Sequence, residues 1–313
     1  MTNRDHAGSV DQNPGPVVVT GFAAFDHIFE VDTLPNAGEA ALVTARLSDV
    51  RGRRGGSGPN VAMVLARHGI HVELITWLGK DTDSFEYLDT LSGAGVGTRG
   101  IFQHSGHARA SWIFTDRGGR SMSFMGAAEQ GFAGLTDIQR EITRVAAWLC
   151  VTAGPLDAAE QLLAELPDDA KLAWVVKADR GAFSAVLVRS LLTRATVVTF
   201  NSQERSFLDE ACAGEIGRYV SPECLLVETR GADGATYSFR GMSRACSTRQ
   251  VATVDSVGAG DVFSGALLGH FLRHPDEPDR SVAAGLAAAF EELAARSTPQ
   301  DRGHTSETGR STQ

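Results

Sequence analysis

The stretch VDSVGAGDVFSGALLGHF, residues 254–271, places three small residues and an acid directly before an apolar helical pattern. Gly258, Ala259 and Gly260 expose the backbone, so N–H groups can converge there, and such a loop at a helix N-terminus attracts anions. Asp261 is then either an ordinary helix cap or a base that takes a proton from a hydroxyl beside a bound phosphate. The preceding QVATVDS pattern predicts a strand. The order of strand, small-residue loop and helix favours the phosphate site over a plain capped helix.

The composition limits the kind of protein this can be. The chain has 313 residues, a net charge of −9 and 42% hydrophobic residues, as expected for a globular protein with a sizeable core. The acidic balance argues against a nucleic-acid partner, and no segment resembles a signal peptide or a membrane span. The cysteines have neither metal-ligand spacing nor a disulfide framework, which suits a reducing compartment. These cysteines are Cys150, Cys212, Cys224 and Cys246. We therefore expect a cytoplasmic protein whose partner is a small molecule.

Strand and helix patterns alternate along the middle of the chain. The stretch PVVVTGFAAFD reads as a buried strand that breaks at Gly21, and VAMVLARHG as an amphipathic helix that ends at Gly69. Further apolar runs follow, each ending in Gly, Asp or Asn, with helical stretches between most of them. This alternation predicts a parallel sheet with helices on both faces and a site beyond the carboxyl ends of the strands. We expect one domain over residues 16–300, between disordered tails at 1–15 and 301–313.

One segment departs from this alternation. The stretch ARASWIFTDRGGRSMSFMG has apolar and polar residues in turn on both sides of a DRGG tip, which predicts a β-hairpin. We expect residues 107–127 and about 29–54 to form a small β lid beside the main sheet. An exposed two-sided hairpin needs cover, and a second copy of the chain is one way to supply it.

Two motifs resemble the signatures of a known kinase family. The stretch DSVGAGD, residues 255–261, resembles the DTxGAGD signature of the ribokinase-like (PfkB) carbohydrate and nucleoside kinases, with Ser256 in place of Thr. Upstream, Gly55, Gly56 and Asn60 match the GGxxxN of the N-terminal signature, and both motifs occur in the family's order. The resemblance implies a ribokinase-like three-layer α/β sandwich with a central, mostly parallel sheet and a small β lid.

The resemblance also implies roles for individual residues. Asp261 is implied as the catalytic base, and residues 258–260 as the anion hole. Asp255 and the backbone of Val257 would lie where many members bind a monovalent cation, so a K⁺ site is expected there. Asp26 would be the acid that binds a sugar diol, a simple turn residue being the alternative. The other implied substrate-binding residues are Gly55, Gly56, Ser57 and Asn60, for which an ordinary glycine-rich turn is the alternative.

Two further stretches resemble the family's nucleotide-binding elements. Asn201 and Glu204 match an NxxE element associated with Mg²⁺ and phosphate, and hard oxygen ligands suit Mg²⁺. The same pair also has the spacing of a helix cap with its capping-box partner, and both roles are compatible. The stretch VETRGADGATY resembles the nucleotide-binding turn, with an arginine near the position where a lysine is common. The residues implied there are Thr229, Arg230, Gly231 and Gly234.

Local features favour the nucleoside branch of this family. The stretches FDHIF and GKDTDSFEYLDTLSGAGV and the hairpin resemble bacterial adenosine kinases, while Ser57 and Ala24 differ from the Lys and Asn that are common in ribokinases. A nucleobase needs an apolar or aromatic pocket. We expect lid aromatics to supply it, Phe114 above all, although packing of the lid against the domain or a second subunit is the alternative. The aromatics considered are Phe102, Trp112, Phe114 and Phe124.

These observations predict an ATP-dependent kinase that transfers the γ-phosphate to a primary hydroxyl, the 5′-hydroxyl of a nucleoside such as adenosine, with Mg²⁺ and in many relatives K⁺. A sugar or polyol kinase of the same family is the first alternative. A protein that binds a nucleotide or sugar without catalysis is the second, but a binding module needs no base at Asp261. The resemblance also makes a homodimer through the lid an expectation.

Overall fold

The computed structural model describes residues 15–118, 120–126, 133–251 and 255–297. Nearly all of the two expected tails lies outside this part of the chain, so their disorder stays a prediction.

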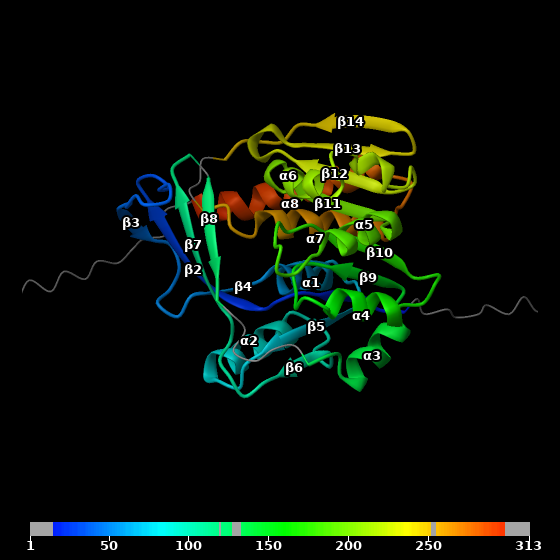
Figure 1. Ribbon diagram of the computed structural model, residues 1–313, viewed down its shortest axis with the longest axis horizontal. Helices are drawn as coiled ribbons and strands as arrows, with labels where there is room; N and C mark the ends of the chain where they lie inside the picture. Colours follow the sequence, from blue (N-terminus) through cyan, green and yellow to red (C-terminus); the bar gives the residue numbers. More distant parts are fainter. Residues whose placement is uncertain (1–14, 119, 127–132, 252–254, 298–313) are drawn as a thin grey trace, which may run out of the picture.

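A large, mostly parallel sheet forms the centre of the protein (Figure 1). Only β13 is antiparallel to its neighbours, β12 and β14; the other described strands of this sheet, β14 included, run in the same direction. The expected parallel α/β sheet is therefore confirmed. In spatial order the strands are β14 (Met242–Cys246), β13 (Ala235–Phe239), β12 (Leu225–Thr229), β11 (Val197–Asn201), β10 (Lys171–Val175), β9 (Trp148–Val151), β1 (Val17–Thr20), β5 (Val72–Leu78) and β6 (Ile101–Gln103).

Helices cover both faces of this sheet and enclose two cores. Alternate residues of β1 divide between them: Val17 and Val19 pack into one core and Val18 into the other. The first core lies under α1 (Ser57–Arg67), α2 (Thr82–Gly93), α7 (Ala259–Phe271) and α8 (Pro278–Ser297). The second lies under α3 (Asp137–Arg144), α4 (Ala158–Glu165), α5 (Ala185–Arg194) and α6 (Ser202–Ala211). Two short 3₁₀ helices are η1 (Ile216–Arg218) and η2 (Gly231–Asp233). The three-layer architecture is thus as expected, and no described helix is long and apolar enough to span a membrane.

A second, smaller sheet stands beside the main one as the expected lid (Figure 1). In its centre β2 and β7 run parallel, so that Asp26 lies opposite Ser111. The lid begins at Ala24, earlier than the expected residue 29, because the chain enters it directly after the break at Gly21. Its strands are β2 (Ala24–Val31), β3 (Val43–Arg46), β4 (Arg53–Gly55), β7 (Ala110–Asp116) and β8 (Ser121–Met125).

The strand expected from QVATVDS is absent from the described part of that stretch. Residues 250–251 and 255–256 have no regular structure, and residues 252–254 lie outside the described chain. The sheet ends earlier, at β14, and the chain then crosses α8, where the Arg249 guanidinium lies 3.8 Å from the centre of the Phe290 ring. In the described part of the connection, the residues directly before the small-residue loop, 255–256, are therefore irregular.

Candidate active site

The loop before α7 presents backbone donors at the helix N-terminus. Gly258 is the N-cap residue with a φ of 84°, a left-handed conformation that favours glycine. Within the described chain, the N–H groups of Gly258 and Gly260 meet no hydrogen-bond acceptor, and a Cβ at Gly260 would enter open space. The Ala259 N–H instead donates to the Ser256 carbonyl at 3.1 Å. The anion hole expected from residues 258–260 thus has two open donors, not three.

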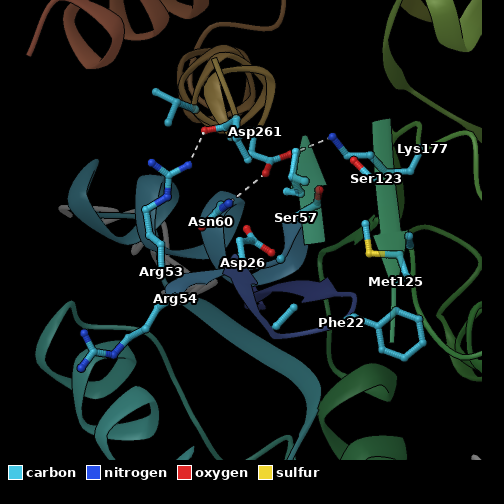
Figure 2. Close-up of a pocket in the computed structure, with 18 of the residues that line it drawn as sticks. Phe22, Asp26, Arg53, Arg54, Ser57, Asn60, Ser123, Met125, Lys177 and Asp261 are labelled. Atoms are coloured by element: carbon cyan, nitrogen blue, oxygen red, sulfur yellow. Dashed lines mark hydrogen bonds and ion pairs between the residues drawn. The ribbon is translucent and has the colours of Figure 1, made fainter. Parts of the chain in front are cut away.

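Asp261 lies in the first turn of α7 and is 4% exposed. Its Oδ2 accepts a hydrogen bond from Asn60 Nδ2 at 2.9 Å, and its Oδ1 lies 3.0 Å from Lys177 Nζ. Figure 2 shows these two side chains approaching the carboxylate from different sides. The carboxylate does not cap the helix, because the N-cap is Gly258 and makes no side-chain cap bond. The simple capping role considered for Asp261 is therefore excluded.

Lys177 is a functional candidate that the sequence analysis missed. It follows the buried strand β10 at its carboxyl end, where a parallel sheet places its site. Burial lowers the pKa of the Lys177 ammonium, but the carboxylates of Asp261 and Glu204 outweigh this effect and leave the pKa raised. The side chain is therefore a cation at neutral pH. A charged residue at the end of the apolar LAWVVKAD stretch is the sequence signal that could have identified it.

Two cavities meet at this point of the structure. The larger has a volume of about 710 Å³ and includes Asp26, Asn60, Gly258 and Asp261 in its wall. The smaller has a volume of about 30 Å³ and is lined by residues of the β10, β11 and β12 strand ends together with Gly260. Lys177 lines both cavities. The N-terminus of α7 thus separates a large compartment from a small one.

Asp26 is the buried acid of the large cavity. It is 8% exposed, and its Oδ1 accepts a hydrogen bond from the Ser111 hydroxyl. Burial raises its pKa to about 6, against the lowering effect of Ser111 and Arg53. Gly55 lies directly against this carboxylate, so a Cβ there would overlap it. Gly56 has a φ of 97° and its missing side chain leaves room for the Phe22 carbonyl. Gly55 therefore brings backbone to the acid, and Gly56 and Ser57 also line the cavity.

The lid aromatics lie elsewhere than expected. Ile113 and Met125 face the large cavity, whereas the Phe114 ring stacks on Phe29 at 5.3 Å and meets Phe124 at 6.1 Å on the opposite face of the lid. The expectation that Phe114 lines the substrate pocket is therefore wrong. Successive residues of a strand point to opposite faces, so the register of the lid decides which ones face inward.

The other two aromatic residues that were considered also lie away from the cavity. Trp112 shares the outer face with Phe114 and stacks on His27 at 6.0 Å. Phe102 lies in β6, at the edge of the main sheet, and does not belong to the lid. Among the described residues, the aromatic side chain that lines the large cavity is that of Phe22, and the Arg109 guanidinium stacks on its ring at 3.8 Å.

The expected nucleotide-binding residues divide into two groups. Asn201, Glu204 and Thr229 line the small cavity together, and the first two form the expected capping box of α6. Burial raises the pKa of Glu204, although Lys177 lowers it in part. Arg230, Gly231 and Gly234 line neither cavity; Arg230 lies 3.6 Å from Glu228, and a Cβ at Gly234 would overlap the Cys246 carbonyl. These three residues shape the β12–β13 turn.

The expected metal positions can also be placed. Glu204 is the acid of the small cavity, and the described residues contain no group of three or more His, Cys, Asp or Glu side chains placed to hold a metal. Asp255 and the Val257 carbonyl lie beside the loop before α7, but guanidinium groups contact both of them.

Comparison with known proteins assigns the family. Residues 16–298 match the pfkB family of carbohydrate kinases. The chain belongs to this family. A nucleoside kinase of Methanothermobacter thermautotrophicus is 29% identical over 80 residues, which are 26% of this chain and 25% of that protein. A fructokinase of Vibrio alginolyticus is also 29% identical, over 109 residues, which are 34% of this chain and 35% of that protein. The chain thus spans only about a quarter to a third of the length of these two curated relatives.

Solved structures share the fold of this pfkB-family chain. The nucleoside kinase of Burkholderia thailandensis in complex with inosine has a TM-score of 0.69 and 19% identity, with 89% of this chain and 91% of that chain covered. The ribokinase of Arabidopsis thaliana, solved with ribose and ATP, has a TM-score of 0.67 and 19% identity, with 88% and 91% covered. The ribokinase-like fold is therefore confirmed. Members of this family are phosphotransferases with a hydroxyl acceptor.

Proposed function

We propose that this protein is an ATP-dependent kinase that transfers the γ-phosphate to a primary hydroxyl, with Asp261 as the base. One observation carries the proposal: the Asp261 carboxylate stands beside two open N–H donors, at the point where a large and a small cavity meet. A hydroxyl entering from the large cavity meets the carboxylate. A phosphate entering from the small one meets the N–H group of Gly260, and the Gly258 residue next to it in the loop lines the large cavity.

The charges and hydrogen bonds at this point suit phosphoryl transfer. The acceptor hydroxyl loses its proton to Asp261 as its oxygen attacks the γ-phosphorus of ATP, while the bond from that phosphorus to the bridging oxygen breaks and ADP leaves. The Asn60 amide holds the carboxylate in place. The Lys177 ammonium and the helix N-terminus face the negative charge on the phosphate oxygens. Positioning and charge stabilisation supply most of the catalysis in such reactions.

Glu204 is the residue that would hold Mg²⁺. Its carboxylate accepts a hydrogen bond from the Asn201 N–H at 2.8 Å through one oxygen. A single carboxylate fits a Mg²⁺ that keeps several waters and binds the nucleotide phosphates. The ion would neutralise charge on those phosphates.

We further propose a nucleoside as the acceptor, phosphorylated on its 5′-hydroxyl, with adenosine as the first candidate. The large cavity joins an acid, Asp26, to an apolar wall that contains Phe22, Ile113 and Met125. A ribose diol can donate hydrogen bonds to the acid, while the apolar wall suits the base. The nucleoside kinases among the relatives and solved structures support this choice.

A sugar acceptor is the second candidate. Several arginines line the cavity and Phe114 does not, so the cavity is less apolar than a nucleobase pocket was expected to be. ADP release should be measured with ATP and Mg²⁺ against a panel of nucleosides, pentoses, hexoses and polyols. Faster release with a nucleoside than with any free sugar supports the first candidate. Preference for a sugar assigns the second, and no release with any of them contradicts both.

Ionisation of Asp26 should control acceptor binding. Because its pKa is about 6, the carboxylate that accepts the diol hydrogen bonds is largely protonated at pH 5. We expect kcat/KM for the acceptor to fall roughly tenfold from about pH 7.5 to about pH 5, and Asp26→Asn to remove this dependence while lowering kcat/KM overall. If kcat/KM falls equally for wild type and Asp26→Asn between pH 7.5 and pH 5, the Asp26 carboxylate does not control acceptor binding.

The same pKa shift has a consequence for stability. Between the ordinary value of 3.8 and about 6, the native state holds a proton on Asp26 that the unfolded chain has released. The contribution of this group to the free energy of unfolding therefore falls as pH rises through that window. Chemical denaturation at several pH values should show that Asp26→Asn is more stable relative to wild type at pH 7 than at pH 4.

The outer lid face is our proposed contact with a second copy of the chain. Trp112 and Phe124 are 42% and 53% exposed there, beside the rings of His27 and Phe114 respectively. We expect the wild-type protein to be a dimer by light scattering and Trp112→Glu to be a monomer, since a buried charge opposes association. Phe102→Glu is a matched control, because Phe102 is also 42% exposed but lies outside the lid. A monomeric wild type, or equal loss in both variants, contradicts the proposal.

A further inference from the structure

Two oxygen-bearing groups lie immediately before α7, at the position where resemblance to the family implied a K⁺ site. They are the Asp255 carboxylate, whose side chain is 13% exposed, and the Val257 carbonyl. A bound cation would have to use these oxygens. In this structure they already have cationic partners.

Arg53 supplies the first of these partners from β4. Its Nη1 donates to Asp255 Oδ2 at 2.7 Å, and its Nη2 lies 3.3 Å from Asp255 Oδ1. The same Nη2 donates to the Val257 carbonyl at 3.2 Å. A guanidinium group suits this arrangement, because its planar fork matches a carboxylate with two parallel hydrogen bonds.

Arg296 supplies the second partner from the last turn of α8. Its Nη1 donates to the Val257 carbonyl at 2.6 Å and lies 3.5 Å from Asp255 Oδ1. Glu292, one turn earlier, accepts from the Nε and Nη2 of Arg296 at 3.2 and 2.8 Å. Glu292 thus binds two of the three guanidinium nitrogens of Arg296, and the third, Nη1, contacts the loop.

We propose that the guanidinium groups of Arg53 and Arg296 replace a monovalent cation at the Asp255 and Val257 oxygens, so that this kinase does not require K⁺. A carbonyl oxygen has two lone pairs, and the two arginines use both of those on Val257. Two fixed positive charges also face the single Asp255 carboxylate, so a K⁺ ion would meet like charge there. The expected K⁺ site therefore does not fit these residues.

The two arginines act as positioning residues for the anion hole. In a trans peptide the C=O and the following N–H point in opposite directions. Holding the Val257 carbonyl on the arginine side therefore directs the Gly258 N–H away from it, and that N–H is one of the two open donors of the proposed phosphate site. This inference rests on the proposed kinase function for its catalytic consequence, but the occupied cation position does not.

The first test compares salts on the wild-type enzyme. Turnover should be measured in KCl, NaCl and tetramethylammonium chloride at the same ionic strength. A value of about 0.1 M screens charges to nearly the same extent as physiological salt. We expect the three rates to agree within about twofold, since the two guanidinium groups already occupy the Asp255 and Val257 oxygens. Activation by K⁺ of about tenfold or more over tetramethylammonium overturns the proposal.

The second test removes one guanidinium. Arg296→Ala should lower kcat about tenfold in tetramethylammonium chloride, the effect of losing a charge-assisted hydrogen bond, and K⁺ should restore much of that loss. A merely structural role would lower kcat equally in all three salts, and that result overturns the proposal. Arg280→Ala is the matched control, because Arg280 lies on the same helix but pairs only with Glu277 at the surface among its described contacts.

A third measurement is independent of turnover. The melting temperature of Arg296→Ala should rise with KCl more than with tetramethylammonium chloride, while that of wild type should not distinguish the salts. If Arg296→Ala does not fold, Arg53→Gln takes its place with the same expected results. Wild type and variants could all lack kinase activity while K⁺ still selectively stabilises the arginine variant. That result would refute the kinase function but support the inference about the cation position. No selective stabilisation in either variant overturns the inference.

Discussion

Replacing Asp261 by Asn should lower kcat by about 10²–10⁴-fold and leave nucleotide affinity nearly unchanged, because the amide cannot take the proton of the acceptor hydroxyl. The substitution keeps the size of the side chain and its contact with Asn60, so the local structure should persist. Turnover under saturating substrates and nucleotide binding by calorimetry are the two measurements. Asp89→Asn, on the exposed side of α2, is the control and should behave as wild type.

Two outcomes would contradict the proposed role of Asp261. Near-normal turnover of Asp261→Asn would show that another group accepts the proton. Equal loss of nucleotide binding and turnover would point to a structural role of the carboxylate instead. Nucleotide binding by wild type without turnover on any acceptor would favour a protein that binds without catalysis.

Replacing Lys177 by Met should lower kcat by about 10²–10³-fold, since a preorganised charge at the transferring phosphate contributes strongly in a site with little water. Methionine keeps the apolar stem of the side chain and removes the ammonium that lies 3.0 Å from Asp261 Oδ1. The loss also leaves a buried carboxylate without its counter-charge, so the melting temperature should fall as well. The measurements are kcat, nucleotide affinity and thermal unfolding.

A second lysine provides the control for Lys177→Met. Lys171 begins the same strand, β10, but is exposed at its far end, where its ammonium lies 5.7 Å from the centre of the Trp148 ring. We expect Lys171→Met to retain wild-type kcat. If Lys177→Met also stays within about threefold of wild type, the ammonium does not face the transferring phosphate.

Much of the site could be predicted from the sequence, because the residues of each motif are close neighbours in the chain. The loop at residues 258–260 and the acid that follows it are encoded within one turn of chain, and the structure places both at the start of α7. The Asn201–Glu204 pair has the spacing of a capping box and forms one. Alternating strand and helix patterns likewise predict a parallel sheet wherever they occur.

The wrong prediction for the lid aromatics shows what local sequence patterns cannot predict. The lid hairpin was expected correctly, but its inner face was not, because a register shift of one residue exchanges the two faces of a strand. Pairing of β2 with β7 sets that register, and it turns Ile113 inward and Phe114 outward. No property of the hairpin sequence alone distinguishes the two choices.

The sequence by itself therefore determined the fold class, the small-residue loop and the acid beside it, since each depends on neighbouring residues and their periodicity. Only the tertiary structure decided that Lys177 meets Asp261, and that Arg53 and Arg296 meet at the Val257 carbonyl. These contacts join residues that are far apart in the chain. They depend on the order of strands in the sheet and on the packing of α8 against α7, which place several strand ends and helix ends at one point.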